Sequence, residues 1–284
     1  MLSLRPRLTQ AVAPLLHQVS AINELGECIS ALIPAERALT VYMDKHELVT
    51  LMTLGAHPEL LVLGFLRNQR LLASVYELES ITVDWEVGAA AVKTRLGISD
   101  IQTRTARRVV TTGCGQGSMF GDLMAEVDGL ELPEARLSQS QLYRIVNTIR
   151  LQESTYKAAG SVHACALFCA DEMLLFVEDV GRHNAIDTIA GWMWLQGDSG
   201  MSGADKVFYT TGRLTSEMVI KSAQLGVPIV VSRSGITAMA FELAQRLGLC
   251  AIGRATNQRF LCYTGAQRLL LAPGLLAGRD SAST

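Results

Sequence analysis

Residues 207–237 read VFYTTGRLTSEMVIKSAQLGVPIVVSRSGIT. Short apolar runs at 207–210 and 229–231 are typical of buried strands, and residues 217–225 between them have helical spacing. Gly226 is a natural stop for that helix. A strand, a helix and a second strand of these lengths predict a βαβ unit.

The same pattern continues on both sides of this unit. Two apolar runs at 162–169 and 173–178 predict a hairpin that leads into a helix at 185–196. Downstream, we expect a helix at 238–247, a strand at 250–252 and a last strand near 260–263. Residues 137–157 predict an amphipathic helix that Ser138 or Ser140 caps and Gly160 ends. The second part of the chain is therefore expected to be α/β with a largely parallel sheet.

The first third of the chain has a different, mixed pattern. Residues 1–20 form a weakly patterned leader. Strands are expected at 38–43, 79–83 and 85–92, short helices at 45–54 and 58–66, and a linker within 93–108. These elements predict a leader and small α+β domain over residues 1–100 and an α/β domain over residues 101–284.

Composition excludes several classes of protein. The chain of 284 residues is 49% hydrophobic and only 18% charged, which excludes a disordered chain. Its net charge of −2 argues against a general nucleic-acid or membrane-surface binder. The longest apolar stretch, 51–66, is interrupted by His57, Pro58 and Glu59 and is too short to span a bilayer. We therefore expect a cytoplasmic protein that binds neither nucleic acid nor membrane.

Three strand–loop–helix junctions share an arginine, a glycine and a Ser, Thr or Asn near the first helical turn. Their arginines are Arg182, Arg213 and Arg233, and the carboxyl ends of parallel strands place such loops on one edge of the sheet. Helix N-termini and guanidinium groups both favour phosphate. Turn formation and helix capping remain the simpler explanation for any one loop. Three such loops together predict a site for a nucleotide or another polyphosphate.

Cys114 differs from the other five cysteines, most of which lie in apolar runs. It stands in a glycine-rich loop at 111–118, TTGCGQGS, which leaves the thiol accessible. Arg107 and Arg108 would favour the thiolate if they lie nearby. The loop predicts a nucleophile or sulfur carrier, with an ordinary turn cysteine as the alternative.

A metal site is not expected at the nearby histidine and cysteines. His163, Cys165 and Cys169 fall within one predicted strand, where their spacing is too tight for the side chains to converge on zinc.

These motifs resemble the FdhD/NarQ family, the accessory sulfurtransferases of formate dehydrogenase. The matching segments are TTGCGQGSMFG from 111, GSVHACAL from 160, EDVGRHNAIDTIAG from 178, TTGRLTSEMVIKSAQLGVPIVVSRSGIT from 210 and LCAIGRATNQRFLCYTG from 249. A weaker match is MDKHELVTLMTLGAHPELLVLGFL from residue 43. Together they cover nearly the whole chain from about residue 30.

The resemblance implies a fold and a reaction. The fold is a cytidine-deaminase-like α/β/α main domain with a smaller N-terminal α+β domain, in a homodimer. The reaction takes sulfur from a cysteine desulfurase as a persulfide on Cys114. That sulfur passes to the molybdenum (or tungsten) bis(guanine dinucleotide) cofactor, a bound substrate that later enters formate dehydrogenase.

The resemblance also places the substrate-binding residues. A nucleotide resembling GDP could occupy the same place, and no intrinsic metal is implied. The family's binding stretch falls on residues 254–259, and the arginine-bearing loops are expected to contribute. The complete expected set is Arg182, His183, Arg213, Ser232, Arg233, Arg254, Ala255, Thr256, Asn257, Gln258 and Arg259.

One departure from the family pattern leaves a second function open. Many members carry CxxC in the glycine loop, whereas this chain has Gly117 at the second position. If that second thiol normally releases the sulfur, Cys114 must act alone or recruit another cysteine. The alternative is a non-catalytic chaperone that binds the cofactor without handling sulfur. A zinc deaminase is a third reading, but HxE…PCxxC is absent from the sequence.

Overall fold

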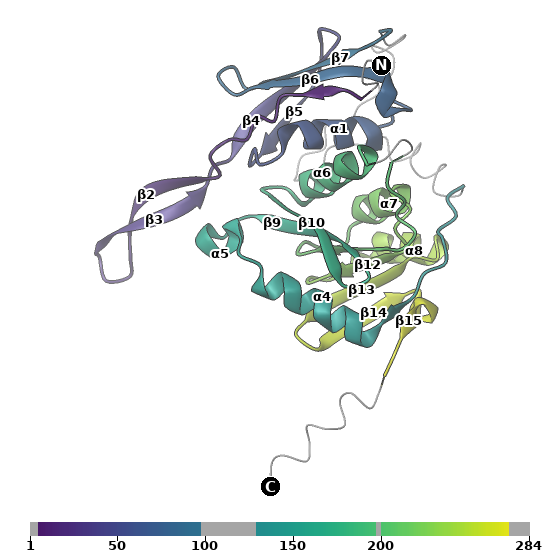
Figure 1. The fold of residues 1–284 in the computed structure, drawn as a ribbon. Helices are drawn as coiled ribbons and strands as arrows, with labels where there is room; N and C mark the ends of the chain where they lie inside the picture. Colours follow the sequence, from purple (N-terminus) through teal and green to yellow (C-terminus); the bar gives the residue numbers. More distant parts are fainter. Residues whose placement is uncertain (1–4, 98–128, 197–199, 273–284) are drawn as a thin grey trace.

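The computed structural model describes residues 5–97, 129–196 and 200–272. Two main sheets lie one above the other in Figure 1, with helices between them. The expected division at residue 100 falls outside the described residues and stays a prediction.

The N-terminal sheet has five strands in the order β1-β6-β7-β4-β5. Helix α1 (Pro58–Asn68) covers its inner face, and apolar side chains of both form one core. Pro58 at the start of α1 is favourable, because the first turn of a helix leaves its N–H groups unpaired. The strands are β1 (Arg7–Leu8), β4 (Arg37–Met43), β5 (His46–Thr53), β6 (Leu78–Asp84) and β7 (Ala89–Thr94). A short 3₁₀ helix, η1 (Val75–Glu77), leads into β6.

The helix expected at 45–54 is wrong, because this segment is strand β5. It pairs antiparallel with β4 across a tight turn at Asp44 and Lys45, whose φ angles are 45° and 73°. Two consecutive positive φ angles match the twist of a hairpin and return the chain directly into the sheet. The strand expected at 85–92 begins later, at Ala89.

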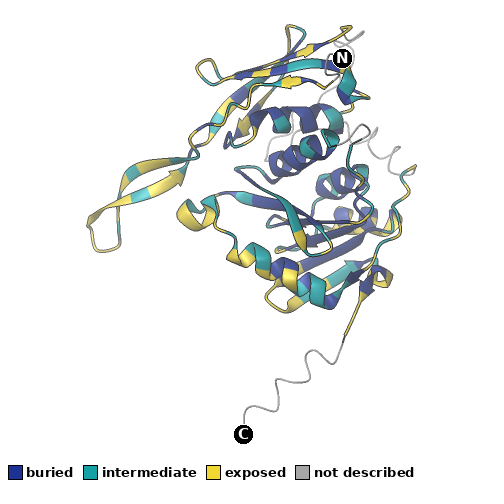
Figure 2. Ribbon diagram, viewed as in Figure 1, coloured by how far each residue is buried: buried dark blue, intermediate teal, exposed yellow. Residues whose placement is uncertain are grey.

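The leader expected over residues 1–20 is also incorrect, because it contains β1 and the beginning of a projecting hairpin. Strands β2 (Leu16–Ile22) and β3 (Cys28–Pro34) form this two-stranded arm. Figure 2 shows it as the most exposed regular structure of the N-terminal half.

The second sheet has six strands in the order β10-β9-β11-β12-β13-β14. The central three, β11, β12 and β13, are parallel, whereas β9, β10 and β14 join by antiparallel pairing. The expected largely parallel sheet therefore holds for its centre only, because both ends are hairpins. The strands are β9 (His163–Cys169), β10 (Glu172–Asp179), β11 (Lys206–Thr210), β12 (Ile229–Ser232), β13 (Cys250–Thr256) and β14 (Arg259–Thr264).

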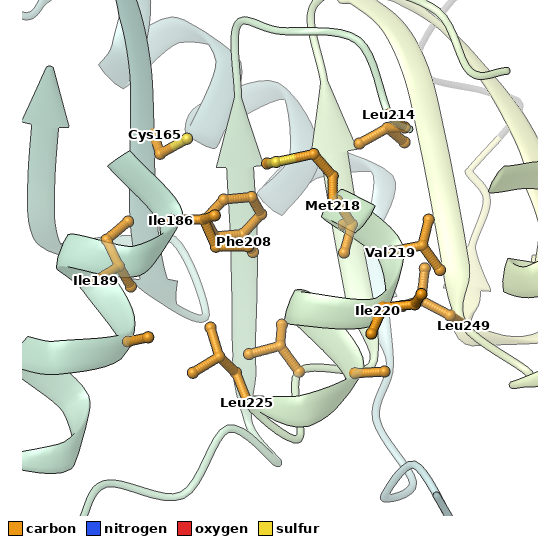
Figure 3. Packing of buried hydrophobic residues seen from close by; sticks show 14 of the residues in the cluster. Cys165, Ile186, Ile189, Phe208, Leu214, Met218, Val219, Ile220, Leu225 and Leu249 are labelled. Carbon is orange, nitrogen blue, oxygen red and sulfur yellow. The ribbon is translucent and has the colours of Figure 1, made fainter. Parts of the chain in front are cut away.

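Helices cover both faces of this sheet. One face packs against α6 (Arg182–Trp194), α7 (Ser216–Gln224) and α8 (Ala238–Arg246). Figure 3 shows this core, with Phe208 of β11 between Ile186 of α6 and Met218 of α7. The other face packs against α4 (Gln139–Leu151). The result is a mixed α/β fold with a helix layer on each side of the sheet.

The helix expected at 137–157 is two helices with a break. Ser138 caps α4 as expected, but α4 ends at Leu151 and α5 (Thr155–Ala159) begins after a new cap at Ser154. The carboxylate of Glu178 accepts the N–H groups of Thr155 (2.5 Å) and Tyr156 (3.0 Å), which anchors the start of α5 to β10. Gly160 ends α5 with a φ of 67°, as the sequence predicts. Short elements β8 (Leu137–Ser138), η2 (Ala266–Arg268) and β15 (Leu269–Leu270) complete the fold.

The two sheets are joined by a close helix crossing and a buried carboxylate. Helices α1 and α6 lie side by side between the sheets (Figure 1), and Gly64 and Gly191 allow their backbones to touch. Asp179, at the end of β10, accepts hydrogen bonds from the Thr53 hydroxyl (2.5 Å) and the Leu54 N–H (3.1 Å) of the other sheet.

Candidate functional site

The predicted site residues gather at one edge of the second sheet. Strand β10 runs in the same direction as β11, since both are antiparallel to β9. The carboxyl ends of β10, β11, β12 and β13 therefore meet at one edge, where the loops with Arg182, Arg213 and Arg233 emerge. The structure confirms the expected meeting of these loops.

The pKa of His163, at the start of β9, is affected by two of these arginines. Burial lowers its pKa below the ordinary 6.5, and the guanidinium groups of Arg182 and Arg213 lower it further. The buried Arg182 side chain packs against the backbone of Gly212. A Cβ at residue 212 would lie 2.7 Å from the Arg182 Cδ, so a side chain there would displace the arginine. Arg213 is exposed. The edge thus has one buried and one exposed guanidinium group near a half-buried imidazole.

Two of the loops are bonded to each other through their backbones. The Leu214 N–H donates to the Gly235 carbonyl (2.9 Å), and the Thr237 N–H donates to the Leu214 carbonyl (3.0 Å). The Ser232 hydroxyl donates to the Gly212 carbonyl (2.7 Å) and accepts the Ser234 N–H (2.9 Å). Ser232 is fully buried, and its hydrogen bonds therefore stabilise the conformation of these loops.

His183 also lies inside the protein. Its Nε2 is 3.3 Å from Oε2 of Glu217, across the contact between α6 and α7, and its side chain is 4% exposed. Lys221 links the same glutamate (3.2 Å) to the buried Asp187 (2.9 Å). His183 therefore belongs to a buried polar network behind the edge, and it lines neither cavity described below.

The predicted stretch 254–259 spans the end of β13, the turn at residues 257–258 and the first residue of β14. Arg254 and Asn257 both have a φ of 51°, and the Arg254 N–H donates to the Ser234 carbonyl (2.7 Å). The β13–β14 ladder is irregular between Gly253 and Thr256 and resumes at the Thr256–Arg259 pair, so the hairpin ends in a bulged tip. The bond to Ser234 fixes the tip against the β12 loop.

Two cavities flank this tip. One, of about 290 Å³, lies between the sheet and helices α4 and α5, and the predicted residues that line it are Arg233, Ala255, Thr256 and Asn257. The other, of about 780 Å³, is more open, and the predicted residues that line it are Arg254, Thr256, Gln258 and Arg259. Thr256 borders both. Arg182 and Arg213 line neither, so the structure divides the expected set into a tip group and an edge group.

Sequence reasoning missed the contribution of the opposite helices. Arg150, Tyr156 and Lys157 line the smaller cavity, and Gln139 and Tyr143 line the larger. The amphipathic pattern of α4 was visible in the sequence, but its docking on this side of the sheet was not. With Arg150 and Lys157, the smaller cavity has three cationic side chains and one carboxylate, Glu178. Its apolar floor is formed by Val146, Ile149, Val162, Ala164 and Phe176.

Cys114 and its glycine loop lie outside the described residues. Among the cysteines that the structure does describe, Cys165 is unsuited to nucleophilic chemistry, because burial raises its thiol pKa to about 12. Within the described ranges, no cluster of three His, Cys, Asp or Glu side chains could hold a metal ion. In the same part of the chain, no helix is long and apolar enough to cross a membrane.

Comparisons with known proteins place this geometry in a family. A sulfur carrier protein FdhD from Bacillus subtilis (strain 168) is 32% identical over 82% of this chain and 88% of its own. A protein of the same name from Geobacillus kaustophilus is 29% identical over 84% of this chain and 90% of its own. A crystal structure from Desulfotalea psychrophila, described as a candidate formate dehydrogenase accessory protein, has the same fold. It matches with a TM-score of 0.71 and 23% identity over 90% of this chain and 100% of its own. The FdhD/NarQ family model matches residues 34–270, and the chain belongs to that family.

Proposed function

We propose that the protein is a persulfide-dependent sulfurtransferase that serves formate dehydrogenase. The observation that carries the proposal is the 32% identity over 82% of the chain to a Bacillus protein named a sulfur carrier. The arginine-bearing edge and the two cavities at the tip of β13–β14 support it, because they suit a large anionic substrate.

Cys114 is the sulfur-carrying residue in this proposal. Its thiolate attacks the terminal sulfur of a persulfide on a cysteine desulfurase. The new bond joins the Cys114 sulfur to that terminal sulfur, and the desulfurase cysteine leaves as a thiolate. The sulfur–sulfur bond then breaks, Cys114 is released as a thiolate, and the terminal sulfur passes to the metal centre of the bound substrate, whose reduced metal would supply the two electrons that convert it to a sulfido ligand.

The substrate is the molybdenum bis(guanine dinucleotide) cofactor. The tip group supplies guanidinium and polar side chains at both cavities, and the edge group adds Arg182 and Arg213. The phosphates of a dinucleotide need such bidentate donors, while the apolar floor of the smaller cavity suits a flat base. The proposal extends to a cytidine-deaminase-like main domain, a homodimer and a cytoplasmic location.

The test is activation of formate dehydrogenase in a bacterial strain that lacks its own accessory protein. The wild-type chain is expected to restore activity, whereas Cys114→Ala reduces it at least about 100-fold, because the residue that carries the sulfur is gone. The matched control is Cys28→Ala, which removes an exposed thiol on the projecting hairpin and is expected to restore full activity.

A cofactor chaperone is the second candidate function, favoured by Gly117 in place of a second loop cysteine. A chaperone would hold and deliver the cofactor without handling sulfur. Under that function, Cys114→Ala would keep most of the activation and loss of the tip arginines would abolish it. Retained activation by Cys114→Ala would therefore replace the sulfurtransferase proposal by the chaperone.

A further inference from the structure

Two cysteines on neighbouring strands form a thiol pair that the proposed function does not use. The Sγ atoms of Cys250 on β13 and Cys262 on β14 are 4.0 Å apart. They lie at the base of the hairpin whose tip is the predicted stretch 254–259. Among the cysteines that the structure describes, no other pair has sulfur atoms in contact.

The two thiols differ in exposure. Cys250 is fully buried in the core beneath α4, whereas Cys262 is partly exposed. A reagent from solvent can therefore reach Cys262 first, while Cys250 is positioned to react only with its neighbour. This asymmetry is typical of a redox dithiol, in which one cysteine is attacked and the other resolves the product.

The hydrogen bond between the two thiols also favours Cys262 as the first thiol to react. Either thiol can donate in this contact, and the Cys262 thiol can also donate to the Thr264 carbonyl (3.3 Å). When Cys250 donates to Cys262, the bond lowers the pKa of Cys262 and raises the pKa of Cys250. The guanidinium of Arg268 is close enough to Cys250 to favour its thiolate when the proton leaves. Cys262 is thus the better nucleophile, and Cys250 is the resolving thiol.

The thiol pair lies at an irregular step of the β13–β14 ladder, where Cys262 pairs with Ile252. Ladder pairing shifts between Ala251 and Ile252, so Cys250 and Cys262 sit beside an irregular step and not within a rigid stretch of ladder. The sulfur atoms must approach by about 2 Å to reach the length of a disulfide.

We propose that Cys250 and Cys262 form a reversible disulfide by exchange with a low-molecular-weight disulfide such as oxidised glutathione. The Cys262 thiolate attacks one sulfur of the oxidised glutathione and releases one glutathione thiolate. Cys250, after losing its proton, attacks the Cys262 sulfur and releases the second. Two protein thiols are oxidised to one disulfide, and one small disulfide is reduced to two thiols.

The disulfide would join the two strands that carry the substrate-binding tip. This modification depends on the described thiol pair alone and holds whether or not Cys114 carries sulfur. Its test uses neither formate dehydrogenase nor a desulfurase, so its failure and the failure of the proposed function are distinguishable.

The experiment treats the reduced full-length protein with oxidised glutathione, blocks free thiols with N-ethylmaleimide and maps peptides without reduction. We expect a peptide pair linked through Cys250 and Cys262, a loss of about two mass units for the linked peptides, and reversal by dithiothreitol. Cys250→Ser should trap glutathione on Cys262, because the resolving thiol is absent. Cys28→Ser, the matched control, should form the link like the wild type.

Two results would overturn the proposal. In the first, Cys250 and Cys262 of the wild-type protein both remain free thiols after oxidation. In the second, Cys262 links to a cysteine other than Cys250. Neither readout requires a variant to fold, since both are made on the wild-type chain.

Discussion

At the scale of single residues, His163 is the most informative side chain of the site. It starts β9 at the edge where Arg182 and Arg213 converge, and these two charges join burial in lowering its pKa. Protonation of this imidazole would place a third positive charge beside the two guanidinium groups, and an anion bound there, as the proposed function requires, would offset that repulsion. The His163 pKa is therefore expected to respond to the charge of any ligand bound at this edge.

We expect the His163 pKa, followed by NMR, to lie below 6.5 in the free protein and to rise when GDP binds. Arg213→Gln should raise it as well, because one repelling charge is removed. A His163 pKa that is unaffected by Arg213→Gln would contradict the assigned geometry of the edge.

The same shift sets a dependence of stability on pH. A histidine whose pKa is lower in the folded state binds protons more readily when unfolded. Its contribution to stability is therefore complete above pH 6.5 and is lost as the pH falls through the folded pKa. His163→Gln should remove this part of the acid sensitivity, which urea unfolding at pH 7 and pH 5 can measure. Equal acid sensitivity in both proteins would contradict this contribution.

The sequence indicated which residue types gather at the edge, but not which of them face a ligand. Glycine and arginine after each strand predicted the meeting of the loops correctly, because strand direction alone brings them together. Ser232 and His183 are buried and bonded to Gly212 and Glu217. Their partners come from other segments, so no local pattern could have distinguished their roles.

At the scale of elements, local sequence patterns predicted most helices and strands correctly. They failed where contacts with other segments determine the secondary structure. The segment 45–54 contains enough Leu, Met and Glu for a helix, yet pairing with β4 across the Asp44–Lys45 turn makes it a strand. The break after Leu151 depends on Glu178, a residue of β10 that anchors α5. Both errors therefore arise from tertiary contacts that override helix propensity.

The crossing of α1 and α6 gives the element-scale prediction. A Cβ at Gly64 would stand 1.6 Å from the Asp187 carbonyl oxygen, so Gly64→Ala must push the two helices apart. We expect a loss of about 3 kcal/mol in the free energy of unfolding, because overpacking is costly in a tight core. Urea denaturation measures it.

Gly235→Ala is the matched control for this substitution. Nothing lies within 4 Å of the place of its Cβ, and its stability change should stay within about 0.5 kcal/mol. If Gly64→Ala were as stable as Gly235→Ala, the helices would not cross as closely as the structure shows.

At the scale of the whole molecule, Asp179 ties the two sheets into one cooperative unit. Besides Thr53 and Leu54, its carboxylate accepts the Gly181 N–H (3.1 Å) and the Asn184 amide (2.8 Å). Burial raises its pKa and these hydrogen bonds oppose the rise. Since the carboxylate serves both sheets and the start of α6, we expect the molecule to unfold in a single transition.

Asp179→Ala should lower the free energy of unfolding by about 3 kcal/mol, because it leaves buried donors on both sheets without their acceptor. Thermal unfolding followed by circular dichroism is the measurement. Glu153→Ala, at a carboxylate whose side chain is 90% exposed, should have little effect. Two separate transitions in the wild-type protein would contradict the cooperative unit.

The central claim concerns sulfur on Cys114, and one measurement tests it directly. The reduced protein is incubated with a cysteine desulfurase and cysteine, and any added sulfur is then located by intact-protein and peptide mass spectrometry. The account predicts one extra sulfur atom on Cys114, absent from Cys114→Ala and unchanged in Cys28→Ala. No added sulfur on Cys114, while the desulfurase is active in the same tube, would contradict it.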